Sequence, residues 1–315
     1  MTEKNQEYTG KVTMNYQFYR GLDTYSDGDI EDRLLEIARK EPQCEEILPE
    51  EDNWALLYHL SPIRENLLEW YDFGKGKSLL EIGAGCGAVT GLFCRKCSRV
   101  VAVDLSKKRS LINAERNRNA ENLEIIVGNF EDIQIDEKFD FVTLIGVLEY
   151  SIYYINSDDP FTDMLKKAKE YVKPGGTLIV AIENKYGIKY WAGATEDHTG
   201  KPFDGIIGYD GVNRVRTFSR NGLEDLLKKS GFSNLQFYYP LPDYKLPNEI
   251  YSEHNLPKHY PVSGHTPNYD TERMVLFNEE KAMNEIIRDG LFEQYANSFL
   301  VFASDRETEN QPEVR

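Results

Sequence analysis

The sequence lacks an apolar run long enough to cross a membrane, and it contains few cysteines. Its longest apolar stretch without a charged side chain, Phe141 to Leu148, is far shorter than the ~20 residues that span a bilayer. The first ten residues are polar, so they predict no secretion signal. The four cysteines are therefore expected to be reduced thiols in a cytoplasmic protein.

Basic side chains are also scarce. The chain of 315 residues has 37 Lys and Arg against 53 Asp and Glu, which gives a formal net charge of −16. Nucleic acids and anionic membranes are bound by basic surfaces that neutralise phosphate groups. The charge therefore argues against both partners, and it favours an enzyme or a domain that binds a small ligand.

Short apolar runs alternate with helix-like segments from Ser78 onward. The runs are Ser78–Ile82, Arg99–Val103, Leu123–Val127, Phe139–Ile145 and Thr177–Ile182, followed by Leu235–Tyr239 and Phe299–Ala303. The helical segments begin near Ala88, Ser106, Pro160 and Ser219. Strands separated by helices predict an α/β fold with a parallel sheet and right-handed crossovers.

We divide the chain into a core and the segments that do not fit its repeating unit. The parts are an N-terminal arm with helices (1–75), the core (76–239 and 296–304), two insertions (184–217 and 240–295) and a tail (305–315) that we expect to be disordered. Long irregular segments within a compact domain are usually lids or substrate-binding insertions. The alternative, structural flaps packed on the sheet, is equally open. If they are lids, we expect both insertions to cover the pocket in which the substrate binds.

The strongest functional signal is a glycine loop between the first apolar run and the helix that follows it. The loop reads Gly83-Ala84-Gly85-Cys86-Gly87. Glycines allow the backbone to approach a ligand closely, and a helix N-terminus attracts a negative group. Asp104 ends the second run 21 residues after Gly83, where a carboxylate can bind both hydroxyls of a ribose. Together these features predict an adenosine-containing ligand.

Two kinds of adenosine ligand fit this pattern. Gly83, Gly85 and Ala88 also satisfy the fingerprint of dinucleotide-binding proteins. Glu81, two residues before the first glycine, would instead repel a pyrophosphate and could attract an ammonium group. Gly87 and the segment Lys173-Pro174-Gly175-Gly176 also differ from the dinucleotide pattern.

The glycine loop and the Pro-Gly-Gly segment resemble those of the class I S-adenosylmethionine-dependent methyltransferases. The resemblance covers Asn53–Tyr239 and Phe299–Ala303. It implies a doubly wound, mostly parallel, seven-stranded Rossmann-like sheet whose last strand is antiparallel, with S-adenosyl-L-methionine as the cofactor. Residues Glu183–Tyr209 further resemble methyltransferases of bacterial surface-polysaccharide pathways.

The resemblance also implies a set of cofactor-binding residues. They are Glu81, Gly83, Ala84, Gly85, Asp104, Leu105, Asn129, Phe130 and Gly146. Glu81, the glycine loop and Gly146 would hold the methionine end, Asp104 the ribose, and Leu105 the adenine. Asn129 and Phe130 stand where the family usually has an acidic residue near the adenine amino group. The amide oxygen of an asparagine can accept the same hydrogen bond.

Three residues are candidates for catalysis. A hydroxyl acceptor needs a base, and ligands of open α/β sheets lie beyond the carboxyl ends of the strands. Glu149 and Glu183 follow the fourth and fifth runs, and His198 lies in the first insertion. Each could instead be an ordinary loop residue, and a solvated loop is the favoured interpretation for His198.

No metal ligand is assigned from the sequence. The triplet Glu196-Asp197-His198 suggests a metal, as does analogy with sugar methyltransferases, but such sites need several converging oxygens that a sequence does not show. Cys94-x-x-Cys97 is a single pair near a helix end and predicts unreactive thiols rather than a zinc or redox site.

The first interpretation is therefore a methyltransferase that acts on a small molecule or glycan, at oxygen. Two alternatives are a nicotinamide-dependent oxidoreductase on a similar sheet and a non-catalytic module that binds S-adenosylmethionine. The residues do not identify the acceptor or an oligomeric state.

Overall fold

The computed structural model describes residues 5–21, 23, 26, 28–40, 53–210, 215–261, 264 and 273–305. The predicted disordered tail beyond Asp305 lies outside these residues. No helix in the described part of the chain is both long and apolar enough to cross a membrane.

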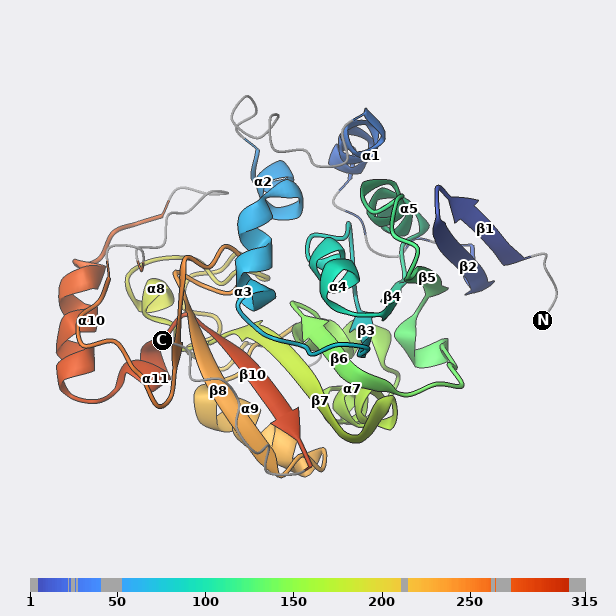
Figure 1. Cartoon of the computed structure of the whole chain (residues 1–315). Helices are drawn as coiled ribbons and strands as arrows, with labels where there is room; N and C mark the ends of the chain where they lie inside the picture. The colour runs from blue at the N-terminus through green and yellow to red at the C-terminus, as the bar shows by residue number, and fades with distance from the viewer. Residues whose placement is uncertain are drawn as a thin grey trace. The chain divides into compact units, whose positions relative to one another are not determined.

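Ten strands form one sheet in the order β1-β2-β5-β4-β3-β6-β7-β10-β8-β9 (Figure 1). Their bounds are β1 Gln6–Thr9, β2 Val12–Phe18, β3 Ser78–Ile82, β4 Arg99–Asp104, β5 Leu123–Gly128, β6 Phe139–Ile145, β7 Val172–Glu183, β8 Asn234–Leu241, β9 Glu249–Ser252 and β10 Ser298–Ser304. The prediction of seven strands was too low. The seven predicted strands are present, and β1, β2 and β9 are additional.

The helices follow the predicted alternation. They are α1 Ile30–Lys40, α2 Trp54–Leu60, α3 Asn66–Glu69, α4 Thr90–Lys96, α5 Lys107–Arg116, α6 Ser151–Tyr154, α7 Pro160–Glu170, α8 Ile188–Trp191, α9 Arg220–Lys229, α10 Glu279–Arg288 and α11 Phe292–Tyr295, with 3-10 turns η2 Pro62–Glu65, η3 Phe130–Asp132 and η4 Leu148–Tyr150. Ser106 and Ser219 cap α5 and α9, because each hydroxyl accepts a hydrogen bond from a backbone N–H in the first turn.

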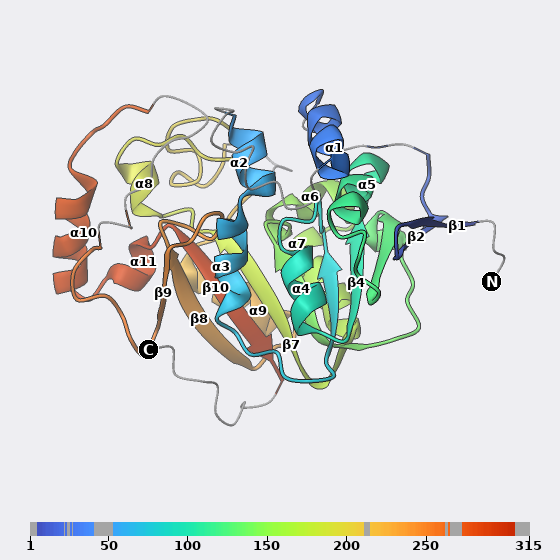
Figure 2. The same ribbon diagram turned by 45° about the horizontal axis from the view of Figure 1, so that its top comes forward.

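The first of two compact units contains the described residues of Met1–Leu144 and Glu170–Gly176. Here β2, β5, β4, β3 and β6 are parallel, and β1 pairs antiparallel with β2. Parallel strands are buried on both faces, and Leu79, Leu80, Val100 and Val101 are fully buried accordingly. Helix α1 lies beside α5 (Figures 1 and 2). Buried apolar side chains of α1, α2 and α5 form one cluster.

The second unit contains the described residues of Ile145–Lys169 and Thr177–Arg315. Its strands pair in antiparallel fashion, β7 with β10, β10 with β8, and β8 with β9. The predicted antiparallel last strand is thus β10, which lies between β7 and β8. Large aromatic side chains fill its core, among them Phe237, Tyr239, Phe292 and Phe299.

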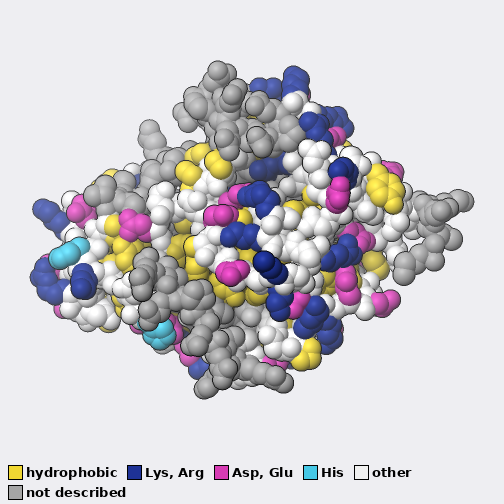
Figure 3. All heavy atoms as spheres, in the orientation of Figure 1, with side chains coloured by type: hydrophobic (Ala, Val, Ile, Leu, Met, Phe, Trp, Pro, Cys, Tyr) yellow, Lys and Arg dark blue, Asp and Glu magenta, His cyan; other side chains and the backbone are white. Residues whose placement is uncertain are grey.

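Charged side chains of both signs are interspersed on the molecular face drawn in Figure 3. The ion pairs among the described residues include Arg99 with Glu124 and with Glu137, and Lys77 with Asp140. Most of these pairs are partly exposed, where each contributes little to stability. Asp140 is an exception, because its carboxylate also accepts hydrogen bonds from uncharged groups.

Asp140, at the start of β6, connects the beginnings of three strands. Its oxygens accept hydrogen bonds from the backbone N–H and the hydroxyl of Ser78, both at 3.0 Å, and from Lys77 and Lys173 at 3.1 and 2.8 Å. Burial opposes ionisation, but these bonds outweigh it and hold the pKa of Asp140 below its usual value. The ionised carboxylate therefore stabilises this end of the first unit.

We expect Asp140→Ala to lower the free energy of unfolding at pH 7 by about 1–3 kcal/mol, because it leaves these donors without their acceptor. Since the pKa is lowered in the folded state, this stabilisation is present above the unfolded pKa of about 4 and is lost as the pH falls below it. Urea denaturation at pH 7 and pH 3 measures both effects. The exposed control Glu285→Ala should change stability by less than about 0.5 kcal/mol, and an equal change in both variants would contradict the role of Asp140.

Candidate active site

The glycine loop follows β3 in the first unit and has the backbone geometry that only glycine adopts without strain. Gly83 and Gly85 have φ angles of 71° and 53°. The N–H groups of Gly83 and Ala84 donate to the carbonyl of Val103 at 2.8 and 3.0 Å, which fastens the loop to the end of β4. Within the part of the chain that the structure describes, a side-chain carbon added at Gly85 would have only an Arg109 nitrogen within 4 Å, at 3.8 Å. The loop is therefore held in place and open at Gly85.

Gly87 is required for packing rather than for ligand approach. Its φ is 76°, and a side-chain carbon there would lie 2.3 Å from Oδ1 of Asn113 on α5. A larger residue would therefore displace the Asn113 side chain and crowd the backbone of α5, whose Cα at Asn113 would be 3.1 Å away.

Asp104 is the last residue of β4 and is oriented by the glycine loop. Its Oδ2 accepts a hydrogen bond from the N–H of Gly85 at 2.8 Å, and its Oδ1 accepts one from the N–H of Ser106 at 2.9 Å. Each carboxylate oxygen keeps a second lone pair for another donor. Burial raises the pKa of Asp104, partly offset by Arg109 and these two bonds. The residues present thus fit the ribose of an adenosine ligand.

Glu81 lies inside β3 and points to α4. Its Oε2 accepts a hydrogen bond from the hydroxyl of Thr90 at 2.6 Å, and burial raises its pKa to about 8. The side chain is therefore mostly protonated at neutral pH, which weakens the argument that it attracts an ammonium group. Its position at the methionine end of the cofactor stays a prediction.

The remaining predicted cofactor residues differ in their surroundings. Leu105 is half-buried, and Asn129 caps η3 by accepting a hydrogen bond from the N–H of Glu131 at 3.4 Å. Phe130 is buried, and its ring lies 5.8 Å from that of Tyr171. These three residues belong to the first unit.

Gly146 belongs to the second unit and permits a close approach. Its φ is 68°, and a side-chain carbon there would lie 2.8 Å from the hydroxyl of Tyr244. Tyr244 therefore reaches the backbone that follows β6 because residue 146 is a glycine.

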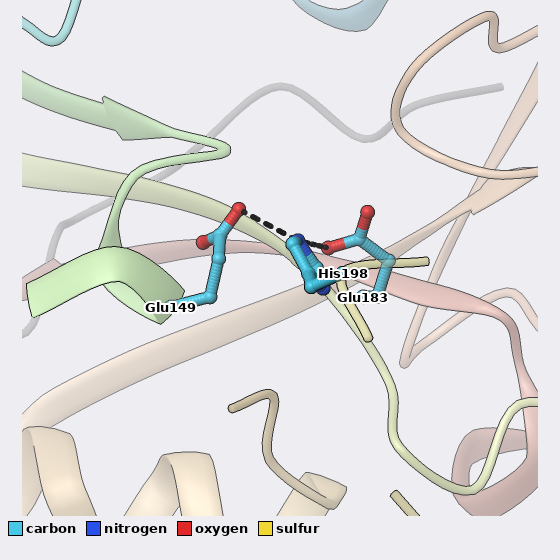
Figure 4. A group of neighbouring side chains, drawn as sticks. All are labelled: Glu149, Glu183 and His198. Atoms are coloured by element: carbon cyan, nitrogen blue, oxygen red, sulfur yellow. Dashed lines mark ion pairs between the residues drawn. The ribbon is translucent and has the colours of Figure 1, made fainter. Parts of the chain in front are cut away.

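The second unit brings the three predicted catalytic residues together. Glu149 lies in η4 after β6, Glu183 ends β7, and His198 comes from the first insertion (Figure 4). His198 Nε2 is 3.6 Å from Glu149 Oε1 and 4.0 Å from Glu183 Oε2. The side chains of Glu149, Glu183 and His198 are only 1%, 0% and 6% exposed. The interpretation of His198 as a solvated loop residue was therefore wrong.

A carboxylate fixes the orientation of the His198 ring. Glu196 accepts hydrogen bonds from His198 Nδ1 at 3.1 Å, from the Tyr209 hydroxyl at 3.1 Å, and from the N–H groups of His198 and Thr199 at 2.8 and 2.7 Å. Tyr209 has a φ of 61°, which is uncommon for a residue other than glycine. The Glu196 carboxylate therefore directs Nε2 of His198 toward Glu149 and Glu183.

The titration of the cluster reflects burial and close charges. Burial raises the pKa of Glu149, and the charge of Glu183 adds to this, while contact with His198 opposes it. For His198, burial lowers the pKa, but the surrounding carboxylates outweigh burial and raise it well above its usual value. These directions show a strongly negative environment around the ring.

Two lysines complete the cluster. Lys245 Nζ is 2.8 Å from Glu183 Oε1 and also pairs with Asp197, while Lys189 Nζ is 2.9 Å from Asp197. The Tyr244 hydroxyl donates to Glu183 Oε1 at 3.3 Å. The two lysines were missed from the sequence, because neither lies in a local motif that marks it as part of a site.

Two carboxylate oxygens in this cluster keep free acceptor capacity. Among the described residues, neither Glu149 Oε2 nor Glu183 Oε2 has a hydrogen-bond partner. One ligand atom from each of Glu149, Glu183 and His198 lies within 4.8 Å of the others, which is a spacing that a metal ion can bridge. The arrangement can accept a proton from a hydroxyl group or bind a cation.

Cys94 and Cys97 have no part in this site. Both are free thiols in the first unit, and burial raises the pKa of each to about 12. The prediction of unreactive thiols agrees with these values.

Comparison with known proteins identifies the domain around the glycine loop. Residues 80–180 match the family model described as "Methyltransferase domain". The mitochondrial ubiquinone biosynthesis O-methyltransferase of Dictyostelium discoideum is 30% identical over 37% of this chain and 38% of that protein. The cypemycin N-terminal methyltransferase of a Streptomyces species is 30% identical over 33% of this chain and 41% of that protein. The chain thus spans about two fifths of the length of these relatives.

Among solved structures, an S-adenosylmethionine-dependent methyltransferase of Thermotoga maritima, described as a possible histamine N-methyltransferase, matches with a TM-score of 0.45. It is 19% identical, and the match covers 84% of this chain and 98% of that one. The family match favours S-adenosylmethionine over the dinucleotide alternative, and the arrangement of Asp104 and the glycine loop agrees with it. Residues 80–180 therefore have the sequence of a methyltransferase domain, and this match agrees with S-adenosyl-L-methionine as the expected cofactor.

Proposed function

We propose that this protein transfers a methyl group from S-adenosylmethionine to a hydroxyl group of a small molecule or glycan. The observation that carries the proposal is the pair of buried carboxylates, Glu149 and Glu183, each with an oxygen that has no partner among the described residues. A hydroxyl must lose its proton during methylation, so its site needs an acceptor within hydrogen-bond reach. An amine needs a base only to become neutral.

The first unit provides most of the cofactor contacts in this proposal. When bound, S-adenosylmethionine supplies an electrophilic methyl group on a positively charged sulfur. Asp104 accepts hydrogen bonds from the ribose hydroxyls with the lone pairs that Gly85 and Ser106 leave free. The open backbone at Gly85 allows the cofactor to lie against the loop.

The second unit provides the acceptor contacts. Glu149 Oε2 takes the proton of the acceptor hydroxyl, and Glu183 is held in place by Lys245 and Tyr244. Both carboxylates follow the carboxyl ends of their strands, where open α/β sheets bind ligands. The two insertions supply His198 and Lys245, so we propose that they also cover the acceptor and exclude water.

The relatives support methyl transfer and leave two kinds of acceptor atom to compare. One is named for methylation at oxygen in ubiquinone biosynthesis, and the other is named for methylation of an N-terminus. The unpartnered carboxylate oxygens favour oxygen in this protein. Mass spectrometry of the product distinguishes a methyl ether from a methylated amine.

Asp104→Ala tests the cofactor site. It should weaken S-adenosylmethionine binding by about 1–3 kcal/mol, because a charged acceptor for the ribose hydroxyls is lost. This corresponds to a rise in Kd of roughly 5- to 150-fold by isothermal titration calorimetry. The control Asp163→Ala, at a half-buried position on α7, should bind normally, and unchanged affinity of a folded Asp104→Ala protein would remove Asp104 from the site.

Glu149→Gln tests the acceptor site. The amide is nearly isosteric but a poor base, so transfer of labelled methyl groups into a metabolite and glycan extract should fall about 10²-fold or more. Cofactor affinity should stay within about twofold, since Glu149 makes none of the proposed cofactor contacts. Glu285→Gln, an exposed change on α10, is the matched control. Full transfer by Glu149→Gln would contradict the role of Glu149, and no transfer by the wild-type protein would support the non-catalytic alternative.

A further inference from the structure

We propose that Glu149, Glu183 and His198 bind one divalent metal ion, of the Mn²⁺ or Zn²⁺ type. The binding site stands on its own, whereas a role for the ion in holding the acceptor hydroxyl rests on the proposed function. The sequence assigned no metal, because the three residues are far apart along the chain and only the fold of the second unit brings them together.

The distances around His198 Nε2 favour a bound metal ion over a direct hydrogen bond or a bridging water molecule. The gaps of 3.6 Å to Glu149 Oε1 and 4.0 Å to Glu183 Oε2 are too long for hydrogen bonds. A bridging water at about 2.8 Å from each atom would hold them roughly 4.5–5.5 Å apart. A metal ion at about 2.0–2.4 Å from each ligand atom fits between them with small movements.

Unpartnered oxygens provide a second observation that points to a cation. Glu149 and Glu183 are almost completely buried, yet Oε2 of each has no hydrogen-bond partner among the described residues. Burying a carboxylate oxygen without a hydrogen-bond partner costs free energy unless a ligand binds to that oxygen. Glu183 Oε2 is also the oxygen of that carboxylate that pairs with His198 Nε2, at 4.0 Å, so it already faces the proposed ion.

The surroundings of His198 resemble the support that metal ligands usually receive. The Nδ1–H group donates to Glu196 Oε1, and Glu196 is fixed in turn by the Tyr209 hydroxyl and two backbone N–H groups. This leaves Nε2 directed at the two carboxylates, where a bound ion would take the place of its proton. A carboxylate on the far nitrogen is the common arrangement behind a metal-bound histidine.

The charges of the cluster also favour a cation. In its ion pairs, five carboxylates (Glu149, Glu183, Glu196, Asp197 and Asp243) share Lys189, Lys245 and His198. Even with His198 charged, two negative charges exceed the positive ones in these buried pairs. A divalent ion supplies that difference.

The ligand set narrows the choice of ion. One imidazole and two carboxylates suit Mn²⁺, Zn²⁺ or Fe²⁺, whereas Ca²⁺ and Mg²⁺ prefer oxygen ligands alone. Three protein ligands leave positions for an acceptor hydroxyl. Its proton would pass to Glu149 Oε2, its oxygen would bond to the methyl carbon, and the electron pair of the carbon–sulfur bond would stay on sulfur.

The test is a titration of the full chain after treatment with a chelator. Mn²⁺ binding is followed by electron paramagnetic resonance and calorimetry, with Zn²⁺ as the competitor. We expect one ion per chain, displaced by Zn²⁺. His198→Ala and Glu183→Gln should weaken binding at least about tenfold, and the positioning variant Glu196→Gln about 10- to 100-fold. Glu285→Gln should bind as the wild type does.

The outcomes separate this inference from the proposed function. If the wild-type protein binds neither ion at about 1 mM, the metal site is wrong whatever the variants do. Binding that His198→Ala leaves unchanged would place the ion elsewhere and overturn the site. Methyl transfer that persists in the chelated protein would remove the ion from the reaction and leave the proposed function intact. An ion bound at these residues without methyl transfer would support the site and contradict the proposed function.

Discussion

Burial of Glu149 and Glu183 is the constraint on which the second unit depends. A carboxylate removed from water must find charges or hydrogen-bond donors, or lose its own charge. Lys245, Tyr244 and His198 converge on these two residues from both insertions. The path of each insertion is therefore tied to two charges at the ends of strands. Segments that are irregular in sequence are held by an electrostatic requirement as well as by an apolar core.

In the first unit, the predicted cofactor-binding loop is held mainly by backbone geometry rather than by pairs of buried charges. This glycine loop is shaped by backbone conformation and by hydrogen bonds between neighbouring strand ends, from Gly83 and Ala84 to Val103 and from Gly85 to Asp104. These contacts need no distant part of the chain. The predicted cofactor site can therefore be recognised from a short motif, and the matched family region, which begins at residue 80, includes this loop.

The predicted and observed folds differ for physical reasons that particular elements show. All seven core strands were predicted, because each contains a short apolar run that is mostly buried. Strand β2 was missed because its buried face presents only Val12 and Met14 within a polar, Tyr-rich arm. Strand β9 lies in a segment rich in proline, and it is ordered by pairing with β8. The Pro-Gly-Gly segment, expected before the fifth strand, lies within β7.

The sequence by itself determined the alternation of strands and helices, the glycine loop and Asp104, because these depend on local periodicity and backbone geometry. It also named Glu149, Glu183 and His198, since two of them follow buried strands. Only the tertiary structure decided that His198 is buried against both carboxylates and oriented by Glu196. It alone decided that Lys245 holds Glu183. Contacts between residues so far apart in the chain arise from the folding of both insertions, and no local pattern records which buried charge will meet which partner.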